Sequence, residues 1–237
     1  PGDYLTVIHI SDHSHEKETN GQLNLAISTV KWGIQGVSSR LVINARTDTL
    51  AKSTFFRRLA GQRCLVCVSG YMEWLPASSK TCPRQPYYFY TTSTAKDKSK
   101  NHLLSPGGSH SMVWLAAIWD GASKCAIVTT DASRDISWCH HRMPAVLHSE
   151  KSVWDWIDPA RETAESVRNL FPPEGILGWH KIQPDFAKRF RRIKKEIQQD
   201  PDSSKRRRVE VGKILQPYNS VTLDNFFNSR HRKDADA

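Results

Sequence analysis

The sequence predicts an α+β protein: one β-rich domain with a mixed, mostly antiparallel, barrel-like sheet and flanking helices, followed by a basic, disordered C-terminal tail. Three observations predict this fold class. Short runs rich in Val, Ile, Tyr and Trp recur between Gly, Ser, Asn and Pro, few segments have helical periodicity, and the composition turns basic and polar after residue 182. With 237 residues, 38% hydrophobic content and eight Trp, the chain can bury one full core.

Each expected strand is a short run of β-branched and aromatic residues bounded by turn residues. These runs lie at 4–10, 23–32, 41–45, 64–72, 86–91, 112–119 and 125–130. Helical patterns are fewer and lie at 50–60, 149–157 and 160–171, with Ser149 as an expected N-cap. The polar segment 95–110, which carries Gly and Pro, predicts a loop.

The character of the chain changes near residue 182. An apolar stripe of Phe186, Phe190, Ile193 and Ile197 on a basic background predicts an amphipathic helix, and docking on the parent domain is favoured over membrane binding. Beyond it, Asp, Ser, Lys and Arg dominate. We therefore expect a domain over 1–182, a basic helix over 183–199 and a disordered tail over 200–237.

The net charge of +10 is unevenly distributed. Residues 181–213 hold twelve Lys and Arg against five Asp and Glu. A concentrated basic stretch attracts nucleic acid through counterion release, and the alternative is a solvated tail that keeps the protein soluble. Five cysteines, no long apolar run and no signal-peptide pattern predict a soluble intracellular protein with reduced thiols and no membrane partner.

Three polar residues stand where the apolar strand pattern predicts none: Asn44, Glu73 and His140. A carboxylate among core residues is a candidate for a raised pKa, and an imidazole can move protons in both directions near neutral pH. Asn44 would orient a substrate or backbone group. Each also has a structural explanation: Asn44 as a turn cap, Glu73 as an ion-pair partner of Arg46 or Arg142, and His140 as a satisfied core histidine.

Local motifs around these residues favour the functional interpretation. They are N-A-R-x-D-T from Asn44, G-x-x-E-W ending at Trp74, and H-x-R-x-P-x-x-L from His140. In this order, and together with Trp32-Gly33, Pro86 to Phe89, Leu115 to Ile118 and Ile127 to Thr129, they resemble the SOS response-associated peptidase (SRAP) family. The resemblance covers Pro1 to about Ile182.

The resemblance implies a DNA damage response enzyme that binds single-stranded DNA and captures abasic sites. In the family an N-terminal Cys, exposed by loss of the initiator Met, forms a thiazolidine with the opened sugar, and peptidase and lyase activities accompany this crosslink. It implies that Glu73 assists ring opening and proton transfer, that His140 acts as acid and base, and that Asn44 positions the N-terminal residue and the DNA.

Further residues follow from the same resemblance. Arg46 and Arg142 are similar to phosphate-contacting arginines, Thr129 matches a position near DNA, and Trp32 and Trp74 offer stacking surface or fill the core. The turn at Pro1 resembles a family turn that follows the first strand, so we expect the given chain to lack the Cys-Gly-Arg start and to be inactive in the covalent steps. The rival hypothesis is a non-catalytic reader of modified or damaged DNA.

The internal cysteines suggest other chemistry that we set aside. Cys64 and Cys67 have C-x-x-C spacing, but no second such pair follows, and residues three apart in a strand face opposite sides. Cys139 and His140 are adjacent, which rarely brings sulfur and imidazole together. We therefore expect no metal and no cofactor. We also expect a monomer.

The tail carries two short motifs. Lys205, Arg206, Arg207 and Arg208 form a cluster typical of nuclear import or nucleic-acid contact, and import is our preferred interpretation, so we expect a nuclear protein. Farther on, 220–233 resembles the motif by which replication proteins bind the sliding clamp. Its apolar plug would be Leu223, Phe226 and Phe227. The alternative is a tail turn that packs on its own domain.

Overall fold

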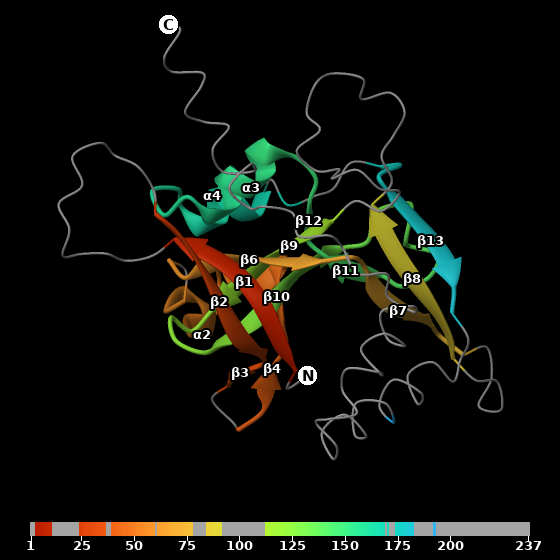
Figure 1. Ribbon diagram of the computed structural model, residues 1–237, viewed down its shortest axis with the longest axis horizontal. Coiled ribbons are helices and arrows are strands. Elements are labelled where there is room, and N and C mark those ends of the chain that lie inside the picture. The colour runs from red at the N-terminus through yellow and green to blue at the C-terminus, as the bar shows by residue number, and fades with distance from the viewer. Residues whose placement is uncertain are drawn as a thin grey trace, which may run out of the picture.

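The computed structural model describes residues 3–10, 24–36, 39–59, 61–77, 84–91, 112–168, 170, 174–182 and 192. Strands are the main regular element of these residues, with a few short helices (Figure 1). Within these residues, no helix is long and apolar enough to span a bilayer. The predicted loop at 95–110, the tail and nearly all of the predicted helix at 183–199 lie outside them, so the import cluster and the clamp motif stay predictions.

Eight strands form the main sheet. They are β1 (Tyr4–Ile10), β2 (Leu25–Trp32), β5 (Asn44–Arg46), β6 (Arg63–Val68), β9 (Val113–Trp119), β10 (Lys124–Asp131), β11 (Arg142–Pro144) and β12 (Val146–Leu147). The order is β11-β10-β2-β1-β6-β9-β12, and β10 also pairs with β9, so β1, β2, β10, β9 and β6 close into a ring. Only the pairs of β10 with β2 and with β5 are parallel. The predicted mixed, mostly antiparallel sheet is confirmed.

The strands β6 and β9 are apolar on both faces because each face meets a different core. Leu65 and Ala116 face one cluster of buried side chains, whereas Val66 and Leu115 face the other. This two-sided burial explains why the two strands read as nearly continuous hydrophobic runs. The ring therefore separates two cores rather than exposing one face to water.

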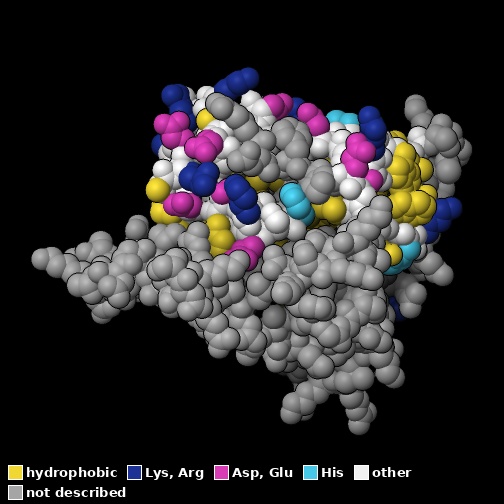
Figure 2. Space-filling model, turned by 90° about the horizontal axis from the view of Figure 1, so that it is seen from above, with side chains coloured by type: hydrophobic (Ala, Val, Ile, Leu, Met, Phe, Trp, Pro, Cys, Tyr) yellow, Lys and Arg dark blue, Asp and Glu magenta, His cyan; other side chains and the backbone are white. Residues whose placement is uncertain are grey.

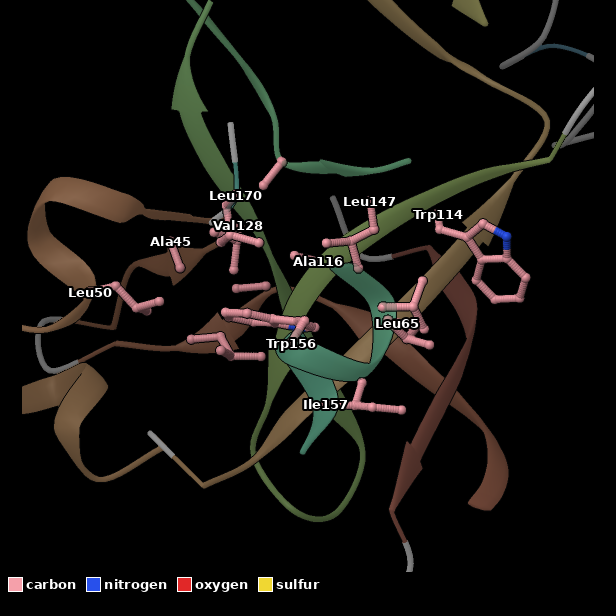
Figure 3. Close-up of a cluster of buried hydrophobic side chains, with 14 of the residues drawn as sticks. Ala45, Leu50, Leu65, Trp114, Ala116, Val128, Leu147, Trp156, Ile157 and Leu170 are labelled. Atoms are coloured by element: carbon pink, nitrogen blue, oxygen red, sulfur yellow. The ribbon is translucent and has the colours of Figure 1, made fainter. Parts of the chain in front are cut away.

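The first core is closed by the helix α3 (Glu150–Ile157). Ser149 caps it as predicted. Its hydroxyl accepts from the Ser152 amide at 3.1 Å, and the Ser152 hydroxyl accepts from the Ser149 amide at 3.0 Å. The helix presents Trp156 to the cluster, and Figure 3 shows this ring among side chains from β6, β9, β10 and β12. The helix α4 (Thr163–Arg168) follows it, and both lie beyond one end of the ring (Figure 1).

A second, three-stranded sheet of order β13-β8-β7 packs against the other core. Its strands are β7 (Tyr71–Leu75), β8 (Gln85–Thr91) and β13 (Leu177–Lys181). Tyr87, Phe89 and Leu177 lie on its buried face, together with Ile136 and Cys139 from the turn after β10. Figure 1 shows this sheet at one side of the ring.

The structure corrects several predicted boundaries. The strand predicted over 64–72 is two strands in different sheets, because the chain turns at Ser69–Gly70. The helix predicted over 50–60 is two single turns, α1 (Thr47–Leu50) and α2 (Thr54–Arg57), and the strand predicted over 41–45 divides into β4 (Leu41–Val42) and β5. The short strands β3 (Ile34–Gln35), β11, β12 and β13 were not predicted, since two to five residues carry too little pattern.

Gly70 is required where the chain leaves the main sheet for β7. A Cβ atom at this position would lie 2.4 Å from the Phe89 carbonyl oxygen and 2.5 Å from Cζ of Tyr88. The backbone oxygen cannot move without breaking the β7–β8 pairing, so Gly70→Ala is expected to lower the free energy of unfolding by about 2 kcal/mol in urea titrations. Gly61→Ala is the control, because a Cβ there meets nothing within 4 Å. Equal stability of the two variants would contradict this explanation.

Candidate functional site

Three neighbouring strands bring two of the polar motifs together. Strand β5 pairs in parallel with β10, and β11 pairs with the same strand on its other side. In this register Arg46 lies opposite Thr129, and Arg142 lies opposite Asp131. Segments almost 100 residues apart in the chain, N-A-R and H-x-R-x-P, therefore meet at one end of β10.

The two arginines of this site share one carboxylate. The Arg46 guanidinium donates two hydrogen bonds to the Asp48 carboxylate, from Nε to Oδ1 at 3.0 Å and from Nη2 to Oδ2 at 2.6 Å. The hydrogen bond from Arg46 lowers the pKa of Asp48, so the carboxylate stays ionised. Nη2 of Arg142 lies 4.0 Å from the same carboxylate. The Arg46 side chain is 54% exposed and can exchange this surface ion pair for a phosphate at little cost.

Arg142 is held much more firmly than Arg46. Its side chain is only 10% exposed, its Nη1 lies 2.6 Å from Asp131 Oδ1, and its Nη2 donates to the Thr129 carbonyl at 2.7 Å. Its buried Nε has no hydrogen-bond partner within the described part of the chain. Thr129 itself is buried. Arg142 therefore supplies a fixed positive charge beneath the site, whereas Arg46 supplies an accessible one.

His140 is oriented by the backbone of Arg142. Its Nδ1 lies 2.8 Å from the Arg142 carbonyl oxygen and 3.1 Å from the Arg142 amide nitrogen. It donates to the first in one tautomer and accepts from the second in the other. Either contact occupies Nδ1 and leaves Nε2 for a substrate. When Nδ1 donates, Nε2 is an acceptor, and when Nδ1 accepts, Nε2 is a donor. The ring centroid of His140 lies 4.5 Å from that of His141, and the two rings are tilted by 37°.

Glu73 lies on β7, on the same face as its cross-strand partner Tyr87. Its Oε1 accepts from the Trp74 amide at 3.2 Å, and its charge acts on the Cys139 thiol and the Tyr71 hydroxyl. The carboxylate is therefore close to the segment that carries His140. The predicted alternative of an ion pair with Arg46 or Arg142 is wrong, because those arginines bind Asp48 and Asp131.

Not every predicted site residue lies where the sequence pattern suggested. Asn44 is exposed rather than embedded in the core, because its short strand runs along the surface beside β10; Glu73 and His140 are half-buried. Trp74 lies on the face of β7 opposite Glu73, against Pro86. Trp32 is half-buried and its Nε1 donates to the Ile43 carbonyl at 2.8 Å. Among the described residues, no hydrogen bond or ion pair links Asn44, Glu73 and His140 to one another.

Comparison with known families explains why these motifs meet. The sequence profile of the SOS response associated peptidase (SRAP) family matches residues 1–188. The chain belongs to the SRAP family. The prediction from the N-A-R, G-x-x-E-W and H-x-R-x-P motifs is thereby confirmed.

Several similar proteins are named abasic site processing proteins. HMCES of Mus musculus is 29% identical over an alignment of 159 residues that covers 60% of this SRAP chain and 45% of the mouse protein. The Saccharomyces cerevisiae protein YMR114C is 27% identical over 84% of this chain and 56% of its own length. YoqW of Bacillus subtilis is 25% identical over 65% of this chain and 67% of its own length. The SRAP chain spans about half the length of its vertebrate relatives.

Solved structures agree with the SRAP fold. A phage-related protein of Bordetella bronchiseptica superposes with a TM-score of 0.54 and 24% identity over 77% of this chain and 79% of that protein. A protein from Bacteroides thetaiotaomicron gives a TM-score of 0.53 and 24% identity over 68% of this chain and 72% of that one. At these identities the likeness concerns the fold.

The four cysteines that the structure of this SRAP chain describes lie in environments that oppose thiolate chemistry. Burial raises the pKa of Cys67 and of Cys125 to about 12, and it raises that of Cys64 as well. Burial and then the charge of Glu73 raise the pKa of Cys139 to about 11. A nucleophilic cysteine needs the opposite shift. Within the described residues, moreover, no group of three His, Cys, Asp or Glu is arranged to hold a metal ion.

Thiol labelling can check this conclusion. With the raised pKa of Cys139, only about 0.1% of its thiol is ionised at pH 8. Cys82 lies outside the described residues and is therefore replaced in the test. We expect the Cys82→Ser variant to take up no iodoacetamide at pH 8 within minutes, and to take up four equivalents in guanidinium. Mass spectrometry of the intact protein gives the count. Rapid native labelling of Cys139 would instead point to an activated thiol.

Two residues near the site escaped the sequence analysis. Trp138 and Trp179 lie outside the motifs, yet both are exposed and their ring centroids lie 4.9 Å apart. The available signal was the aromatic residue directly before Cys139 in a segment that otherwise supplies site residues. Trp179 could not be found from the sequence, because it lies 41 residues after Trp138 in the chain and the pairing of β13 with β8 places it beside that residue.

Proposed function

We propose that this protein processes abasic sites in single-stranded DNA by bonding covalently to the opened sugar, with Glu73 and His140 as its proton-transfer groups. The observation that carries the proposal is the register of β5, β10 and β11, which sets an accessible Arg46 beside a fixed Arg142 and an oriented His140. The names of the relatives support the same substrate class.

The reaction needs proton transfer before any bond to the protein can form. An abasic sugar opens when C1′–O4′ breaks, the ring oxygen gains a proton and the C1′ hydroxyl loses one. A half-buried carboxyl group and an imidazole whose Nδ1 is already engaged by the backbone suit these two transfers. Asn44, exposed on β5 two residues before Arg46, would position the reacting residue and the DNA.

Under the family resemblance, the bond to the sugar comes from an N-terminal Cys ahead of Pro1. Its α-amine condenses with the aldehyde, which releases one water and leaves an imine. Its thiol then adds across the C=N bond, so that a C–S bond forms and the thiol proton passes to nitrogen. The result is a five-membered thiazolidine, and the peptidase and lyase activities of the proposal act at the same centre.

The test compares two forms of the protein that carry the family start ahead of Pro1, one beginning Cys-Gly-Arg and the other Ala-Gly-Arg. Each is incubated with a single-stranded oligonucleotide that bears one abasic site. We expect a heat-stable adduct on a denaturing gel with the first form and none with the second. Absence of any adduct would overturn the proposal.

The same experiment separates the rival hypothesis of a non-catalytic reader. A reader would bind the abasic strand reversibly, and 1 M salt would release it, because salt screens electrostatic contacts but does not cleave a covalent bond. Complete release by salt, with no band of raised mass, would favour the reader.

A further inference from the structure

Two exposed tryptophans form an aromatic surface beside the proposed reaction centre. Trp138 is 40% exposed and Trp179 is 47% exposed, and their ring centroids are 4.9 Å apart at 55°. Tyr87 supports both edge-on, at 4.7 Å from Trp138 and 5.6 Å from Trp179. Figure 2 shows hydrophobic side chains gathered at the end of the molecule where β8 and β13 lie in Figure 1. We call Trp138, Trp179 and Tyr87 the aromatic platform.

Hydrogen bonds hold the platform in place before any ligand arrives. Nε1 of Trp138 donates to the Asp135 carbonyl at 2.8 Å, which fixes its ring on the turn. The Asp135 carboxylate accepts from the Gly175 amide at 2.8 Å, so the turn is tied to the segment leading into β13. A surface ordered in this way loses little side-chain entropy on binding. The rings offer apolar faces to a ligand rather than a particular hydrogen-bonding pattern.

The register of the three-stranded sheet sets the platform next to Glu73. Glu73 lies opposite Tyr87 on β8, and Tyr87 lies opposite Lys181 on β13. Paired residues share a face, and adjacent strands are about 4.8 Å apart, so Glu73 and Lys181 flank Tyr87 within about 10 Å of each other. Trp138 comes two residues before His140. A DNA strand that presents its abasic sugar to Glu73 and His140 thus has the aromatic platform and the exposed ammonium group of Lys181 one nucleotide away.

We propose that the aromatic platform, with Lys181, binds the unpaired base and the phosphate of a nucleotide next to the abasic site. This inference rests on the proposed function, since it extends the same strand across the molecule. Every base offers a π face to an aromatic ring, whereas the bases of a duplex are already stacked, so the platform selects single-stranded DNA without reading its sequence. Lys181 gives this end of the strand a positive charge to pair with phosphate.

The test measures reversible binding apart from the reaction. The chain is titrated with a fluorescent oligonucleotide whose central residue is tetrahydrofuran, an abasic analogue that has no aldehyde. We expect Trp179→Ala to weaken binding about 5- to 30-fold, the lower part of the range for one aromatic–base stack. Tyr4→Ala is the matched control, because Tyr4 is 71% exposed but lies on β1. Thermal unfolding of each variant checks that it is folded, and Trp138→Phe provides a milder second variant.

A second oligonucleotide identifies the bound group. In it, tetrahydrofuran residues also replace the neighbours of the central one, so that no flanking base is left to stack. The proposal requires that Trp179→Ala causes no loss of affinity for this second oligonucleotide. An equal loss of affinity for both oligonucleotides, or no loss for either, would overturn the proposal. The aromatic platform would then be a candidate binding surface for a protein segment. The proposed function is judged separately by adduct formation at a true abasic site, so either hypothesis can fail while the other stands.

Discussion

Replacing Glu73 with Gln is expected to slow adduct formation about 100-fold at neutral pH. The amide keeps the size of the side chain and can still accept from the Trp74 amide, but it cannot exchange a proton with the sugar. A positioned acid or base contributes about 10²- to 10⁴-fold to such steps. His140→Ala should cause a loss of similar size, since it removes the Nε2 that the Arg142 backbone leaves available. Single-turnover rates on denaturing gels measure both.

The matched control for the first variant is Glu162→Gln. It neutralises an exposed carboxylate just before α4, so it tests whether loss of charge alone slows the reaction. We expect it to react at the unaltered rate. If Glu73→Gln reacts as fast as this control, Glu73 has no part in proton transfer, and only its packing beside Tyr87 would remain to explain it.

The parts of the fold that could be predicted are those whose signal is local. Runs of β-branched and aromatic residues predict the long strands. A cap residue followed by an apolar face at helical spacing predicts α3. The prediction failed where pairing partners decide the outcome. A three-residue strand such as β11 exists only because β10 offers it a hydrogen-bonding edge, and nothing within three residues encodes that edge.

The site shows the same division. The types and order of Asn44, Glu73 and His140 were enough to predict the family, but their exposure was not predictable. Apolar neighbours in sequence suggested burial for Asn44, and the structure exposes it because alternate residues of a surface strand face opposite ways. The ion pair of Arg142 with Asp131 likewise depends on the β10–β11 register, and the sequence had suggested Glu73 as an alternative partner.

Replacing Trp156 with Ala is expected to destabilise the fold strongly. The ring is fully buried on α3, its Nε1 donates to the Cys64 carbonyl at 2.9 Å, and the Arg63 guanidinium lies 5.8 Å from its centroid. Arg63 in turn donates to the carbonyls of Asp158 and Arg161, so the same tryptophan connects β6 to the end of α3 and the turn after it.

Removing this ring leaves a cavity in the first core and removes the hydrogen bond from the indole to the Cys64 carbonyl, and together these losses should lower the free energy of unfolding by about 4 kcal/mol. The melting temperature should fall by about 10 °C. Trp156→Phe keeps an aromatic ring of smaller volume but loses the N–H, so its cost of about 2 kcal/mol isolates the hydrogen bond and the missing ring edge. Calorimetry that finds the two variants equally stable would mean that the core closes around the gap, and that α3 is held by its cap and its ion pairs rather than by this ring.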